Sequence, residues 1–274
     1  MRRVVATGLG LVAITTATAA CVLGYRGLSA VAGEHDLAGI DEIRIDLPDT
    51  PLTVTACSAG TEACPEVLSY RGQWQSTGGT GRDAERNATS PRLRFSTDGA
   101  FAALVAVVPL EVVGQVDLAM DEIEVPDDRD LDLRTGVGDV QVVGTVASVV
   151  IDVEVGDVSV FGADAGLGVH TGRGDLQIET PGPADVETGR GFIDVTQTGE
   201  GRDLRVHAES GSVVVRLASD ANLELTIDTP DTIRIQTDAI ATVTSGHFER
   251  RTGSGNVRVE LSSEGGDIEV LLAR

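Results

Sequence analysis

The sequence predicts an all-β protein, a single-stranded β-helix (β-solenoid) with about 18–20 residues per turn. The phrase Thr-Gly-x-Gly-Asp-aliphatic recurs in the second half of the chain, with clear copies from Thr135 and from Thr171 and a shorter copy midway, at Gly156, so that the turn glycines are 18 residues apart. Between these glycines β-branched residues alternate with polar ones, which indicates short, half-buried strands. Only 3% of the 274 residues are aromatic, whereas 33 are glycine, a composition that suits a narrow solenoid interior.

Residues 131–274 form the regular part of the predicted solenoid. Looser copies of the phrase continue toward the C-terminus, at 188–191, 209–213, 252–257 and 265–268. One such unit holds about two short strands and cannot bury its own apolar face, but a stack of units can. Alignment of the copies predicts an inward column of Leu133, Ile151, Val169, Val186 and Val206, followed by an outward column of Arg134, Asp152, His170, Glu187 and His207. Opposite charges along the outward column would contribute a few tenths of a kcal/mol per pair.

Residues 1–25 have the pattern of an export signal. Two arginines follow Met1, and the run from Val4 to Tyr25 has no charged residue. Three modes of attachment stay open. Thr18-Ala19-Ala20-Cys21 is similar to a bacterial lipobox, which would make Cys21 a lipidation site. The run is also long enough to span a bilayer uncleaved, and simple secretion after cleavage is the third mode.

The segment between the export signal and the regular repeats is predicted to be less uniform. Residues 26–39 are small and polar and are interpreted as a tether. The solenoid domain is expected to span 40–274, with irregular turns and a cap over 40–130. Within that part, 75–91 is a surface loop by composition, and 102–108 is either a buried strand or a plug over the open end of the solenoid.

Cysteine spacing supports export. Cys57 and Cys64 flank a small polar loop and are expected to form a disulfide in an oxidising compartment. A metal or redox site is the alternative, but no histidine lies near and the spacing is not Cys-x-x-Cys.

Charge limits the partners of the folded domain. The formal net charge is −22, and all 21 basic residues are arginine. Such a surface disfavours nucleic acid and anionic lipid. We therefore expect membrane contact only through the N-terminal anchor, and a location in the cell envelope: the outer membrane, the periplasm or the cell surface.

Three aspartates occupy the same position of successive turns: Asp139, Asp157 and Asp175. Like charges stacked at strand spacing repel, so the column requires an explanation. Each carboxylate either accepts backbone N–H groups within its own turn, or the column binds a hard cation such as Ca²⁺. Arg173-Gly174-Asp175 spells the integrin-binding tripeptide, but the repeat already requires its glycine and aspartate, so we interpret it as coincidence.

Catalysis finds little support in the sequence. The four histidines are scattered along the chain, from His35 to His247. No nucleophile elbow, zincin or phosphate-loop motif occurs. A glycan-active β-helix enzyme would need paired carboxylates and aromatic platforms, yet the chain has one tryptophan and two tyrosines. We expect no catalytic residue and no bound cofactor apart from the calcium alternative.

The repeat phrase resembles a known family. Residues 123–126 (Ile-Glu-Val-Pro), the run 131–142 with its Thr-Gly-Val-Gly-Asp turn and the degenerate Gly-Asp turns that follow are similar to the bacterial putative-adhesin family of β-strand-repeat proteins, a domain-of-unknown-function family. The resemblance covers roughly 40–274 and is strongest after 120. It implies an exported, right-handed β-solenoid without known catalytic residues.

Three functions are therefore expected, in decreasing order. The first is a non-enzymatic cell-envelope solenoid, an adhesin or structural protein whose long faces contact an envelope protein or a glycan. The second is a calcium-binding surface module built on the aspartate column. The third is a glycan-active enzyme.

Overall fold

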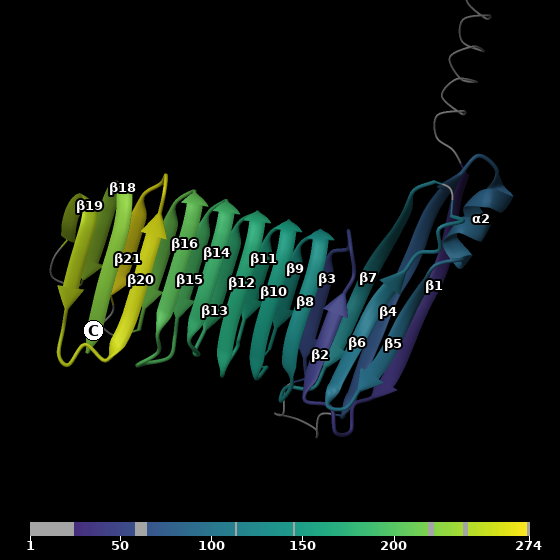
Figure 1. The fold of residues 1–274 in the computed structure, drawn as a ribbon, viewed down its shortest axis with the longest axis horizontal. Helices are drawn as coiled ribbons and strands as arrows, with labels where there is room; N and C mark the ends of the chain where they lie inside the picture. Colours follow the sequence, from purple (N-terminus) through teal and green to yellow (C-terminus); the bar gives the residue numbers. More distant parts are fainter. Residues whose placement is uncertain are drawn as a thin grey trace, which may run out of the picture.

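The computed structural model describes residues 25–57, 65–112, 114–144, 146–218, 222–237 and 241–272. These residues form one continuous sheet of 21 strands, wound so that successive strands stack along one axis (Figure 1). The predicted all-β, solenoid-like fold is confirmed. The winding sense, by contrast, stays a prediction.

The central coils consist of two strands each, one on either face. The first strands are β8 (Asp130–Val137), β10 (Ser148–Val155), β12 (Gly166–Arg173), β14 (Ala184–Arg190) and β16 (Leu204–Ser210). The second strands are β9 (Val140–Val143), β11 (Val158–Phe161), β13 (Leu176–Thr180), β15 (Ile193–Gln197) and β17 (Val213–Leu217). Every strand pairs in parallel with the equivalent strand of the next coil.

The strand register confirms the predicted inward column. Leu133 pairs with Ile151, Ile151 with Val169, Val169 with Val186, and Val186 with Val206. All five side chains are buried. Alternation along each strand therefore places one aliphatic layer inside every coil, and stacking joins these layers into a single core.

The N-terminal coils are stacked out of sequence order. The strands β2 (Glu42–Asp46) and β3 (Leu52–Ala56) lie between the first regular coil, β8–β9, and the coil made by β6 (Phe101–Val107) and β7 (Val116–Val125). The segment 102–108 is thus mainly a strand that is paired on both sides, and it does not act as a plug.

The predicted tether at 26–39 is wrong for most of its length. Tyr25–Asp36 forms β1, which pairs antiparallel along its whole length with β4 (Val67–Gly78), and β4 pairs antiparallel with β7. On the other face, β5 (Arg92–Asp98) pairs antiparallel with β6. Small residues suggested a tether, but Gly27 and Gly33 are needed because added Cβ atoms would lie 2.2 Å from Ala84 O and 2.4 Å from the Tyr70 hydroxyl.

The predicted surface loop at 75–91 is also wrong. It contains the end of β4 and the helix α2 (Gly81–Thr89), which lies beside the start of β1 at one corner of the molecule (Figure 1). The Thr80 hydroxyl caps the helix by accepting the Asp83 N–H at 3.1 Å. Ala84 and Ala88 are buried against β1 and β4.

The C-terminal end is closed by a long hairpin. The strand β18 (Leu223–Thr237) crosses both faces, with its first half paired to β20 (Val257–Ser263) and its second half to β21 (Ile268–Leu272). Outside it, β19 (Ala241–Arg251) pairs antiparallel, with a register shift between Thr229 and Thr232 where the hairpin turns the corner. The strands β20 and β21 lie between β18 and the last regular coil, again out of sequence order.

Candidate functional site

The stacked turns between the two strands of each coil explain the repeat phrase. An ideal Cβ on Gly174 would lie 1.8 Å from the Gly156 carbonyl oxygen, and one on Gly156 would lie 2.1 Å from that of Gly138. The same contact recurs at Gly191, Gly211 and Gly266. The glycine is therefore required because the carbonyl group of the neighbouring coil occupies the space of a side chain.

The aspartate column is a hydrogen-bond ladder between coils. Asp139 Oδ1 accepts the backbone N–H of Asp157 at 2.9 Å, and Asp157 Oδ1 accepts that of Asp175 at 2.8 Å. Asp175 Oδ1 accepts the N–H of Phe192 at 2.7 Å. The carboxylates do satisfy backbone donors, but in the next coil and not within their own turn as we expected. Sequence spacing could not show this, because the donor lies one coil away.

The Arg173-Gly174-Asp175 tripeptide belongs to the same ladder. Gly174 packs against the neighbouring coil and Asp175 accepts a backbone N–H. The turn architecture therefore accounts for two of its three residues.

One face of the solenoid has a column in which acidic side chains mostly alternate with arginine or histidine side chains. We call it the charged face: the outward side of β2, β8, β10, β12, β14, β16, β20 and the first half of β18. The predicted outward column is confirmed by the register, and it extends at both ends. In spatial order the column is Asp46, Arg134, Asp152, His170, Glu187, His207, Ser262, Asp228 and, on β19, His247.

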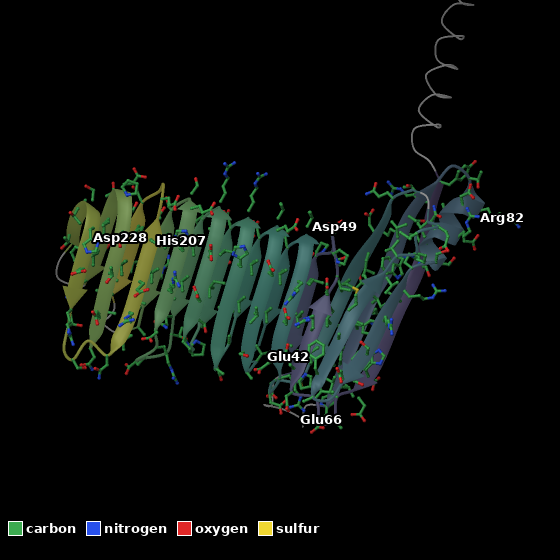
Figure 2. The ribbon with its side chains drawn as sticks, viewed as in Figure 1. Glu42, Asp49, Glu66, Arg82, His207 and Asp228 are labelled. Atoms are coloured by element: carbon green, nitrogen blue, oxygen red, sulfur yellow. The ribbon has the colours of Figure 1, made fainter. Side chains whose placement is uncertain are left out.

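Three of the four histidines lie in this column. His170 Nδ1 is 3.7 Å from Glu187 Oε2, and His207 Nδ1 is 2.8 Å from Ser262 Oγ. His247 contacts Asp228 at 2.6 Å and Glu249 at 3.1 Å. Hydrogen bonds to Asp228 and then to Glu249 raise the pKa of His247. Figure 2 shows His207 and Asp228 on the same part of the molecule.

The end members of the column were missed by sequence reasoning. Asp46, Ser262 and Asp228 join it only because their coils are stacked out of order. No spacing rule along the chain predicts these neighbours.

A second outward column contains a half-buried ion cluster. Asp132 contacts Arg44 at 2.6 Å and Arg134 at 3.0 Å. Burial raises the pKa of Asp132, but the hydrogen bonds from Arg134 and Arg44 outweigh it, so the net shift of this pKa is downward. Because Arg44 belongs to β2 and Asp132 to β8, the cluster links the coil formed by β2 and β3 to the regular coils.

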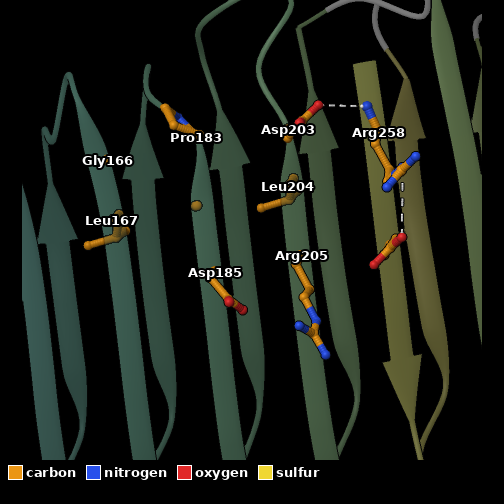
Figure 3. A pocket seen from close by; sticks show the side chains of 10 residues that line it. Gly166, Leu167, Pro183, Asp185, Asp203, Leu204, Arg205 and Arg258 are labelled. Carbon is orange, nitrogen blue, oxygen red and sulfur yellow. Dashed lines mark hydrogen bonds and ion pairs between the residues drawn. The ribbon is translucent and has the colours of Figure 1, made fainter. Parts of the chain in front are cut away.

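A shallow groove of about 360 Å³ crosses the charged face at the starts of β12, β14, β16 and β20 (Figure 3). Its lining is mostly apolar and includes Pro183, while Leu167 and Leu204, which also line it, are only 4% and 2% exposed. Its rim carries Asp185, Arg205 and Arg258. The Asp203 carboxylate accepts the backbone N–H of Arg258 at 2.8 Å. Gly166, at an outward position where β12 begins, lines the groove without contributing a side chain.

The opposite face is chemically different. We call it the polar face: the outward side of β3, β9, β11, β13, β15, β17, β21 and the second half of β18. One of its columns begins with uncharged residues, Thr53, Gln141, Ser159 and Gln177, before Asp194. Asp194 pairs with Arg216 of the next strand.

The remaining predicted site residues are the cysteines. Cys57 follows β3 and is disulfide-bonded. Cys64 lies outside the described residues, so the identity of the partner stays a prediction. Cys21 also lies outside them, and its lipidation is untested. Within the described ranges no three His, Cys, Asp or Glu side chains are grouped closely enough to hold a metal ion.

Among the described residues, no helix is both long enough and apolar enough to cross a membrane.

Comparison with known proteins gives a family match. The model of the Toastrack DUF4097 family matches residues 113–271, which is more than half of the chain. A search of curated proteins gives no match.

Solved structures give remote similarities. A putative adhesin from Bacteroides fragilis is 12% identical with a TM-score of 0.38, over 88% of this chain and 97% of that one. A putative cell adhesion protein from Clostridium sporogenes is 10% identical with a TM-score of 0.36, over 90% of this chain and 100% of that one. A putative adhesin from Parabacteroides distasonis is 10% identical with a TM-score of 0.30, over 88% and 97%.

Proposed function

The chain belongs to the Toastrack DUF4097 family, and we propose that it is a non-enzymatic, exported cell-envelope protein that binds an extended segment of a partner across its charged face. The observation that carries this proposal is the groove beside the charge ladder. A mostly apolar lining with a few charged groups on the rim is the usual composition of a recognition site.

The groove chemistry favours a peptide segment over a glycan. Among the residues that the structure describes, no aromatic side chain lines it, so a sugar ring has no platform there on which to stack. The rim offers both guanidinium and carboxylate groups, on Arg205 and Asp185, at neighbouring outward positions of β16 and β14. These groups match polar and charged side chains of a partner.

Binding across strands suits this surface. The outward columns repeat at about 4.8 Å from coil to coil, so an extended partner that crosses the coils meets a new charged residue at each step. Alternating signs then fix its register more than its affinity.

The test is charge reversal in the groove with a matched control on the polar face. Arg205→Glu should abolish capture of a partner from envelope extracts. Arg234→Glu changes the same charge at an exposed site of β18 on the polar face and should leave capture unchanged. Equal loss in both variants, or in neither, would overturn the proposal, and capture that glycosidase treatment removes would assign the groove to a glycan.

The proposal also includes membrane attachment through the N-terminus and a right-handed solenoid. Residues 1–25 direct export, and either Cys21 lipidation or an uncleaved span holds the protein at the membrane, as the sequence pattern supports. The Cys57–Cys64 disulfide closes the loop between β3 and β4. Right-handed winding is supported by the strong preference of parallel crossover connections.

The calcium-binding alternative has less support. Each column aspartate already uses Oδ1 to accept a backbone N–H, which stabilises the carboxylates without a cation.

A further inference from the structure

We infer that the corner around α2 rests on the lipid bilayer and so orients the solenoid in the envelope. The α2 corner comprises residues 25–28, 77–92 and 107–112. The inference rests on the proposed N-terminal attachment, but not on the charged-face groove.

Backbone pairings bring these three segments together. Tyr25 pairs with Gly78, and Arg92 pairs with Val107. The Thr77 N–H donates to the Gln115 carbonyl at 3.0 Å, which brings the start of β7 to the same place. The start of β1, the helix α2 and the end of β6 therefore form one corner of the molecule (Figure 1).

Exposed large apolar side chains gather at this corner. Leu110 is fully exposed, Leu28 and Tyr25 are 60% and 58% exposed, and Val107 and Val108 are nearly half exposed. Such a grouping is costly in water and indicates a contact surface. Leu28 comes from one face of the solenoid and Val107 from the other, so the patch surrounds the corner instead of continuing either long face.

The chain leaves no linker between this corner and the predicted anchor. The strand β1 begins at Tyr25, directly after the uncharged run from Val4. If lipid is attached at Cys21, Tyr25 lies four residues further along the chain, and a fully extended chain of that length spans at most about 14 Å. A bilayer-spanning segment would leave still less. Either mode of attachment holds the corner at the lipid surface.

Local charge permits this contact although the net charge of the whole chain does not. The corner has four arginines, Arg26, Arg82, Arg86 and Arg92, against three carboxylates, those of Asp83, Glu85 and Glu111. The chain as a whole carries −22. An anionic headgroup layer therefore repels most of the molecule and leaves this corner as a side that can approach. Tyrosine and arginine are also suited to the interface, because each combines an apolar stem with a polar end.

The experiment uses the full chain reconstituted in vesicles of phosphatidylcholine and phosphatidylglycerol. Amide hydrogen exchange is measured on α2, at 81–89, and on β19, at 241–251. The variant is Leu110→Asp, and its matched control is Val243→Asp, which places the same charge at an exposed apolar site on the distant β19. Both sites are exposed, so both variants should fold, and thermal unfolding checks this.

We expect exchange of α2 to be several-fold slower in the wild type and in Val243→Asp than in Leu110→Asp, with β19 unchanged in all three. Equal α2 exchange in the three proteins, or failure of the chain to float with the vesicles, would overturn the inference. If Leu110→Asp instead abolishes self-association seen by light scattering, the corner binds a second copy and not lipid. Partner capture through Arg205 is measured separately, so failure of the proposed function would leave the α2 result intact.

Discussion

The central coils and the two ends of the solenoid bury the same kind of aliphatic core by different pairings. From β8 to β17 each strand pairs in parallel with the equivalent strand one coil away. At the ends the outermost strands pair antiparallel, as β1 does with β4, β5 with β6 and β19 with β18. At both ends a coil is also inserted out of sequence order.

The difference shows what each part must achieve. A central coil has an equivalent coil on both sides, so its strands pair in parallel at both edges and the same turn motif recurs. An end has only one neighbour and must turn its open edge away from further copies of itself, since exposed edges invite aggregation. The stability of the coils should therefore depend on the shared turn, and that of the ends on individual side chains.

The largest effect is expected from a central turn. Gly174→Val places a side chain where the Gly156 carbonyl oxygen lies 1.8 Å from the Cβ position, so we expect a loss of at least about 3 kcal/mol. Chemical denaturation measures this loss. The control is Gly168→Ala on β12, the strand that precedes this turn, where the added Cβ meets its nearest atom, on Val150, only at 3.9 Å. Equal effects of the two substitutions would contradict the steric role of the turn glycines.

The next prediction tests whether the N-terminal cap, the antiparallel strands β1, β4 and β5, unfolds separately from the central coils. Trp74 is buried on β4, and its Nε1 finds no acceptor among the described residues. Trp74→Ala should cost about 3 kcal/mol, whereas Trp74→Phe should cost clearly less because it removes no hydrogen bond. Limited trypsin digestion of Trp74→Ala should cut first at cap arginines such as Arg71. First cuts in the central coils would show instead that cap and coils unfold as one unit.

A smaller effect is expected from the aspartate ladder. Asp157→Ala leaves the Asp175 N–H without its side-chain acceptor, which should cost about 1 kcal/mol. Asp152→Ala removes a carboxylate from the exposed charge column and should cost less than about 0.5 kcal/mol. Urea unfolding of both variants gives the comparison. A larger cost for Asp152→Ala would mean that the charge ladder, and not the turn, holds the coils together.

The two ends should respond oppositely to pH. His35 stacks on Phe95 at a centroid distance of 4.0 Å, and burial lowers the pKa of His35. Its neutral form is favoured in the folded state, so stability of the N-terminal end should fall as the pH drops below the ordinary histidine value of 6.5. The pKa of His247 is raised, so its contribution is fully present below 6.5 and is lost as the pH rises through the higher folded value.

Hydrogen exchange between pH 5.5 and 8 separates these two responses, after correction for intrinsic exchange. His35→Phe should remove the acid sensitivity of β1, and His247→Gln should remove the base sensitivity of β19. A common response at both ends would contradict the assignment.

The smallest effect is expected from divalent cations. The hydrogen-bond ladder already occupies Asp139, Asp157 and Asp175, so the melting temperature should be the same in EDTA and in millimolar calcium. A cation that binds only the folded state would raise it. A clear rise would return the calcium hypothesis to first place.

The same comparison explains how much could be predicted from the sequence. The inward column from Leu133 to Val206 and the turn glycines follow from a period that repeats along the chain. The inserted coils do not, because the pairing of Arg44 with Asp132 or of Ser262 with His207 joins segments more than 50 residues apart. No local pattern encodes such a register.

Two errors had local causes. The helix α2 carried a capping signal in Thr80 and Asp83, but a composition rich in glycine, serine and threonine suggested a loop. The strand β1 was read as a tether because its glycines and alanines are small, although close packing against Tyr70 and Ala84 requires small residues there. The groove was not predicted, since its lining comes from β12, β14, β16 and β20, which become neighbours only after stacking.

Closing both ends with their own hairpins leaves the middle of the molecule free to change in length during evolution. Duplication or loss of one central coil would alter the distance between the two ends by about 4.8 Å and would disturb neither cap. The number of coils would thus set how far the C-terminal hairpin lies from the N-terminal end, and with the proposed attachment it would set how far that hairpin extends from the membrane.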